Sequence, residues 1–85
     1  MQSFMYTIKI PVGLHARHAG IMVKAGKDFE SEIRVWLGDR SADGKRILAL
    51  MGLGIKQGDL IRVTAEGPDE DAAIQALKGV FWANF

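Results

Sequence analysis

The sequence of 85 residues contains no cysteine. This absence excludes disulfide bonds and thiolate metal sites, and it is compatible with a reducing compartment. An excess of charge is also lacking, because 11 basic and 10 acidic side chains leave a net charge of +1. A chain this close to neutrality has no bulk field to attract nucleic acid or anionic lipid. We therefore expect no nucleic-acid partner.

Long apolar runs are absent as well. Residues 1–8 alternate in polarity and contain neither a basic segment nor an unbroken apolar run, which argues against a signal peptide, and no stretch is long enough to span a membrane. We expect a soluble cytoplasmic protein without direct membrane insertion. The length predicts one domain over residues 1–85, near the lower limit at which a core forms without disulfide bonds or a metal ion.

Three stretches alternate between apolar and polar residues with the two-residue period of half-buried strands: 4–10, 32–37 and 60–65. A tight turn at Gly38-Asp39 predicts a further short strand over 40–42, so that the strand at 60–65 is the last of four. In the last of these, Thr64 is predicted to face outward, as is Trp36 in the second. Helical spacing of small and apolar residues predicts helices from Ala16 onward, over 47–51, and after Pro68. The order βαββαβα predicts an α/β fold of the α+β type: an open-faced two-layer sandwich whose four-stranded antiparallel sheet is covered on one face by three helices.

Several residues are predicted to begin or end these helices. Gly52 and Gly54 supply a glycine stop for the short helix, and Asp43 is a candidate cap at its start. Pro68 suits the first turn of the last helix, and the acidic residues that follow it favour the positive end of the helix dipole. The aromatic residues Trp36, Trp82 and Phe85 are expected to cover the edges of the sheet and helices.

The segment from Pro11 to Gly20 lies where the first strand pattern gives way to the first helix pattern. The side chain of His15 and the amides just after it are therefore expected to meet at a helix N-terminus, a ready site for a phosphoryl group or another anion. Arg17 adds a planar fork of donors with a fixed positive charge. A nucleophilic imidazole beside such a cradle indicates a histidine that carries phosphate.

The motif Gly13-Leu14-His15-Ala16-Arg17 resembles that of HPr, the histidine-containing phosphocarrier of the bacterial phosphoenolpyruvate-dependent sugar phosphotransferase system. The resemblance continues through residues 29–33, 53–59 and 65–70. It implies that His15 accepts a phosphoryl group on Nδ1 from phosphorylated Enzyme I and passes it to IIA domains of sugar permeases. Arg17 and the backbone amides of Ala16, Arg17 and His18 would stabilise the transferring group. The protein would be a covalent carrier component rather than an independent enzyme.

Two residues depart from the family pattern. His18 stands where the family normally has proline, which restores a backbone N–H and introduces a second possible acceptor; the helix is expected to turn its side chain away from that of His15. Arg46 stands where many relatives from Gram-positive bacteria carry a regulatory serine. Arginine has no hydroxyl to phosphorylate, so control by HPr kinase/phosphorylase at this position is not expected.

A basic and apolar surface near His15 is predicted to bind partner proteins, and its residues are Lys24, Lys27, Lys45, Arg46, Leu48 and Met51. The alternatives are that the four cations are merely solvated and that the two apolar side chains belong to the core. His15 and His18 at helical spacing could bind a metal, but no Cys, Asp or Glu lies near them in sequence to complete the shell. We expect no metal, no cofactor and a monomer.

Two other functions remain open from the sequence. One is a carrier in a regulatory branch, such as a nitrogen-type phosphotransferase system, which uses the same chemistry. The other is a regulatory binding module that is not phosphorylated; retention of His15 and Arg17 speaks against it, because the regulatory paralogue of this fold lacks the histidine.

Overall fold

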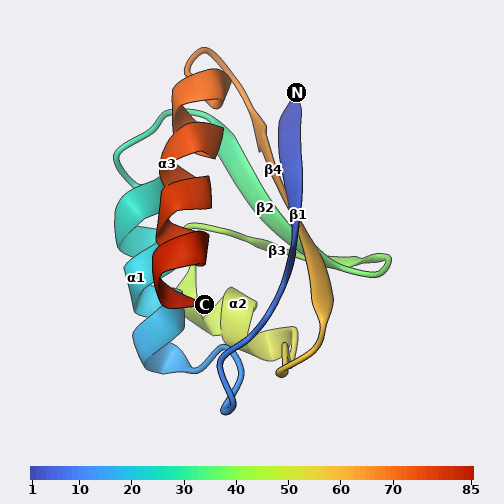
Figure 1. Cartoon of the computed structure of the whole chain (residues 1–85). Helices are drawn as coiled ribbons and strands as arrows, with labels where there is room; N and C mark the ends of the chain where they lie inside the picture. The colour runs from blue at the N-terminus through green and yellow to red at the C-terminus, as the bar shows by residue number, and fades with distance from the viewer.

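The computed structural model describes all residues from Met1 to Phe85. Its elements follow the predicted order, and their bounds are β1 (Gln2–Thr7), α1 (Ala16–Gly26), β2 (Glu32–Leu37), β3 (Arg40–Asp43), α2 (Ile47–Gly52), β4 (Leu60–Glu66) and α3 (Glu70–Asn84). Figure 1 shows the three helices on one face of the sheet, while the other face has no helix over it. The predicted open-faced sandwich is confirmed.

The sheet is antiparallel throughout and has the strand order β1-β4-β2-β3. Its register aligns one buried side chain from each strand in a row across the inner face, namely Phe4, Val63, Val35 and Ala42. The two-residue period seen in the sequence therefore matches the pairing, since a shift of one residue would turn each apolar set toward solvent.

The core fills the space between this inner face and the helices. Met22 from α1, Leu50 from α2, and Leu77 and Phe81 from α3 are fully buried. Phe81 packs edge-on against Phe4 and Phe85, with ring centroids 5.5 and 4.7 Å apart. Packing of this kind lets an 85-residue chain form a core without disulfide bonds.

The first strand is shorter than predicted at its C-terminal end. β1 stops pairing with β4 at Thr7, opposite Leu60. The next apolar residue, Ile8, is still buried, but its amide donates to the Asp59 carbonyl at 2.9 Å, and the amide of Ile10 donates to the Phe85 carbonyl. The alternating pattern continues past the strand because this loop also packs on the core.

The outward position predicted for Thr64 is confirmed, but its side chain is buried. It lies on the outer face of β4, yet it is buried because the Trp36 indole covers it and donates from Nε1 to Thr64 Oγ1 at 3.2 Å. On an otherwise solvated face, one large side chain is thus enough to bury a neighbour on the next strand.

The start of α3 also differs from its prediction. Pro68 precedes the N-cap residue Asp69 and is therefore outside the first turn. The Asp69 side chain caps no amide of its own helix and instead accepts bonds from the amides of Glu30 and Ser31, at 2.8 and 2.9 Å, and from the Ser31 hydroxyl. These bonds lower the pKa of Asp69 below its usual value, with the Ser31 hydroxyl as the largest cause. Asp69 thereby joins α3 to the turn before β2.

The short helix α2 begins after Arg46, and Asp43 does not cap it as predicted. Asp43 Oδ1 accepts a bond from the Lys45 amide at 2.9 Å, two residues along the chain, which closes the turn before the helix instead. The predicted glycine stop is confirmed, because Gly54 follows the end of α2 with φ +67°. No helix in the fold combines the length and apolar character needed to cross a membrane.

Candidate functional site

His15 is the N-cap residue of α1. Its backbone is extended, with φ −88° and ψ 179°, and its carbonyl accepts the first helical bond from the Ala19 amide at 2.9 Å. The side chain forms no capping hydrogen bond and is exposed to solvent. An imidazole in this position is free to approach a reacting group on a second protein.

The loop that presents His15 is fixed by a close backbone contact. Gly13 has φ +77°, and a Cβ built on it would lie 2.5 Å from the Ile55 carbonyl oxygen. That same oxygen accepts a bond from the Leu14 amide at 3.1 Å, and the Leu14 side chain is buried in the core. His15 is therefore mounted on a rigid turn whose geometry needs glycine.

The first three amides of α1 have no hydrogen-bond acceptor in the protein. Those of Ala16, Arg17 and His18 donate to no backbone or side-chain oxygen, as is usual in the first turn of a helix. They lie at the positive end of the helix dipole, directly after His15. The predicted position of His15 at a helix N-terminus is therefore confirmed, and an open set of donors directly follows it in the chain.

Arg17 is exposed and has no carboxylate within 4 Å, because the two ion pairs of the structure lie elsewhere, between Met1 and Glu70 and between Arg46 and Asp43. Its guanidinium is free to bind an incoming anion.

His18 lies in the same turn but in a different environment. Its ring is half-buried and meets the Phe85 ring edge-on, with 5.7 Å between the centroids. Nδ1 is shielded from solvent and has no hydrogen-bond partner. Burial lowers the pKa of His18, and the nearby Arg17 and His15 lower it further.

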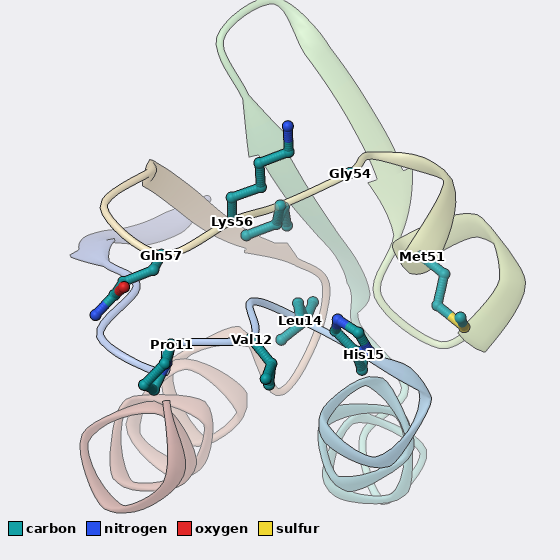
Figure 2. Close-up of a pocket in the computed structure, with 9 residues that line it drawn as sticks. Pro11, Val12, Leu14, His15, Met51, Gly54, Lys56 and Gln57 are labelled. Carbon is teal, nitrogen blue, oxygen red and sulfur yellow. The ribbon is translucent and has the colours of Figure 1, made fainter.

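An open groove of about 590 Å³ adjoins His15. Figure 2 shows it between the segment before α1 and the segment after α2, with the His15 ring at one end near Met51. The residues that line it are Pro11, Val12, Leu14, His15, Met51, Gly54, Ile55, Lys56 and Gln57. Sequence analysis did not find Val12, Lys56 or Gln57, because the pairing of Leu14 with Ile55 that brings the two loops together is a long-range contact with no local signal.

The two apolar residues of the predicted partner surface lie on the exposed side of α2. Leu48 is 83% exposed and Met51 41% exposed, whereas the intervening Leu50 is fully buried. The α2 helix therefore turns one apolar side to the core and another to solvent.

The cations of this surface also differ from one another. Lys24, Lys27 and Arg46 are exposed. The ammonium of Lys45 is bound to the Phe29 carbonyl at 2.6 Å, and its side chain is half-buried. Lys45 thus joins two loops of the protein, and the other three cations are more accessible to a partner.

Comparisons with known proteins agree with this geometry. The family described as "PTS HPr component phosphorylation site" matches residues 2–82. Phosphocarrier protein HPr of Mycoplasma pneumoniae is 42% identical over 82 residues, which cover 94% of this chain and 92% of that protein. A multiphosphoryl transfer protein of Xanthomonas campestris is 38% identical over 93% of this chain but only 9% of its own length. The crystal structure of HPr-C-His from Thermoanaerobacter tengcongensis superposes with a TM-score of 0.91 at 36% identity, covering 98% of this chain and 93% of that one.

Proposed function

The chain belongs to the HPr family, the phosphocarriers of the phosphotransferase system, and from this premise we propose that His15 is the residue that carries the phosphoryl group. The observation that supports this assignment most directly is the exposed, uncapped imidazole next to three amides without acceptors. Of the two histidines, His15 is exposed and directly precedes these amides, whereas His18 is half-buried.

The proposed reaction is a transfer between two nitrogen atoms. The lone pair of His15 Nδ1 attacks the phosphorus of a phosphohistidine on the donor protein, the new N–P bond forms, and the donor's N–P bond breaks. The amides of Ala16, Arg17 and His18 and the Arg17 guanidinium are placed to bind the equatorial oxygens of the transferring group, whose charge they would stabilise. Release to the acceptor reverses these steps, and the openness of the site suits a carrier that must give up its cargo.

The proposed donor is Enzyme I, and the proposed acceptors are IIA domains of sugar permeases. We assign their docking to Leu48 and Met51 on the exposed side of α2 and to the neighbouring cations. These cations are Arg46 at the start of α2 and Lys24 and Lys27 at the end of α1, with Lys45 as a minor contributor. An exposed apolar centre with a basic rim is suited to an acidic partner surface. We further propose that residues 1–85 act as a single HPr-like domain, as a monomer in the cytoplasm.

The experiment that tests His15 is phosphorylation by Enzyme I and phosphoenolpyruvate, followed by intact mass measurement. We expect an acid-labile mass increase of one phosphoryl group in the wild type and in His18→Gln, and no increase in His15→Ala. An increase that persists in His15→Ala and is lost in His18→Gln would move the site to His18. Parallel reactions with Enzyme I of a sugar branch and of a nitrogen branch identify the branch that this carrier serves.

A further inference from the structure

The side chain of Arg40, the first residue of β3, binds the end of α2. Its guanidinium donates from a single nitrogen, Nη2, to the Leu53 carbonyl at 2.7 Å and to the Gly52 carbonyl at 3.4 Å. These are the only hydrogen bonds of the side chain, and neither ion pair of the structure includes it. Arg40 therefore joins the start of β3 to the last turn of α2, which lies 12 and 13 residues further along the chain.

The helix α2 has few contacts of its own that hold this end in place. Six residues are too few for a helix to be stable by itself, and the carbonyls of its last turn have no partners within the helix. A Cβ built on the exposed Gly52 would have no atom within 4 Å, and Gly54 has φ +67°. Leu50 and Leu53 pack the inner side of the helix on the core, but Arg40 is the only side chain that bonds to the carbonyls of the last turn.

The hairpin of β2 and β3 fixes the position of Arg40. Arg40 pairs with Leu37 across the two-residue turn of Gly38 and Asp39, in which Gly38 has φ +63°. Turns of this length set the register of the strands that they join. The guanidinium is thus held at the base of the turn, and its positive charge is favourable there because a helix has its negative end at its C-terminus.

We propose that Arg40 is a positioning residue for partner docking: by holding the last turn of α2, it keeps Leu48 and Met51 in the orientation that Enzyme I and the acceptor domains bind. This inference rests on the proposed function of His15 and of the α2 surface. Met51 is 41% exposed, lines the groove beside His15 and directly precedes Gly52, whose carbonyl Arg40 binds. Without these bonds, a smaller fraction of molecules would present the docking surface, and the apparent affinity would fall in proportion to that fraction.

The expected effect is on partner binding rather than on transfer. The turn that presents His15 is held by the contacts of Gly13 and Leu14 with the Ile55 carbonyl, in which Arg40 takes no part. Methionine has a side chain of similar length to arginine but no donor. Arg40→Met is therefore expected to raise the KM for the carrier in the Enzyme I reaction about three- to tenfold and to leave kcat within about twofold of the wild type.

The matched control is Arg62→Met, which removes the same charge from another exposed position of the sheet. The Arg62 guanidinium lies over the Trp36 ring, 5.8 Å from the centroid, and does not bind α2. We expect Arg62→Met to have the KM of the wild type. A KM that rises equally in both variants would overturn the inference, because the effect would then be one of net charge.

Two further measurements test positioning directly. The amides of Leu53 and Gly54 donate to the Leu50 and Met51 carbonyls, so their hydrogen exchange reports opening of the last turn. Exchange at both should be faster in Arg40→Met than in the wild type or in Arg62→Met. The ratio of the KM of Arg40→Met to that of the wild type should stay nearly constant between low salt and about 0.5 M salt, because the lost bonds lie within the carrier.

Unchanged hydrogen exchange or an unchanged KM in Arg40→Met would refute the proposal. A KM ratio that falls toward one at high salt would refute it as well, because Arg40 would then be a direct contact for an acidic partner. Hydrogen exchange requires no phosphoryl transfer, and intact mass measurement shows whether the wild type is phosphorylated. Failure of the proposed function is therefore distinguished from failure of this inference.

Discussion

Replacing Gly13 with alanine is expected to destabilise the fold and to impair transfer, and Gly38→Ala provides the matched control. Both glycines have positive φ, +77° and +63°, so both alanines would suffer the cost of a left-handed backbone. Only at Gly13 would the new Cβ also meet backbone, 2.5 Å from the Ile55 carbonyl oxygen, whereas no atom lies within 4 Å at Gly38.

The magnitude follows from this difference. The positive φ costs about 1 kcal/mol in each variant. At Gly13 the loop must also move by about 0.9 Å to restore an ordinary contact of 3.4 Å, which strains or breaks the bond from Leu14 to Ile55 and costs a further 1 to 2 kcal/mol or so. We therefore expect losses of about 2–3 kcal/mol for Gly13→Ala and about 1 kcal/mol for Gly38→Ala. For a domain of this size, these losses correspond to decreases in Tm of roughly 10–15 °C and 5 °C.

Thermal and urea unfolding measure the stability, and the rate of phosphorylation by Enzyme I is measured at a temperature where both variants are folded. Gly13→Ala should be slower than the wild type because the shifted loop carries His15, whereas Gly38→Ala should react at the wild-type rate. Equal destabilisation by the two substitutions, or full activity in Gly13→Ala despite its lower stability, would refute the idea that this contact positions the imidazole.

Three further predictions concern the partner surface, the anion site and the turn before β2. Leu48→Ala should leave the free energy of unfolding within about 0.5 kcal/mol of the wild type but raise the KM for the carrier in the Enzyme I reaction, while Leu50→Ala should cost about 2–5 kcal/mol; unfolding and steady-state assays test both. Arg17→Lys should retain more transfer activity than Arg17→Ala, because a charge remains although the planar fork is lost; equal rates in rapid-quench experiments would contradict this role. The folded pKa of Asp69 lies below 3.8, so its stabilising effect is present at neutral pH and is lost as the pH falls through that folded value. Asp69→Asn should accordingly unfold at a lower urea concentration at pH 7 and show less acid dependence than the wild type below about pH 4.

Much of this fold is predictable from sequence because it depends on short-range periodicity. The alternation in residues 32–37 and 60–65 identifies which side chains of β2 and β4 face the helices, and pairing then follows from burying that face. His15 could be placed at a helix start for the same reason, since Pro11 and Gly13 interrupt one period and a second begins at Ala16.

The features that sequence analysis missed are long-range contacts of polar groups. Asp69 appears locally as a helix cap, but its carboxylate oxygens accept hydrogen bonds from amides 38 and 39 residues earlier in the chain. Lys45 appears as a surface cation until the fold brings the Phe29 carbonyl within reach. Thr64 has an outward position in its strand, and the Trp36 side chain on the neighbouring strand donates a hydrogen bond to it. Such contacts carry no periodic signal, so they become visible only in three dimensions.

The Phe85 carbonyl accepts the amides of Lys9 and Ile10, at 2.7 and 3.2 Å, and so joins the end of α3 to the segment that leads to His15. Fraying of the last helical turn would release both amides at once, and the loop between β1 and α1 would become more mobile. The rate of hydrogen exchange at the amides of Lys9 and Ile10 should therefore report how often the C-terminal turn opens and releases the segment that leads to His15.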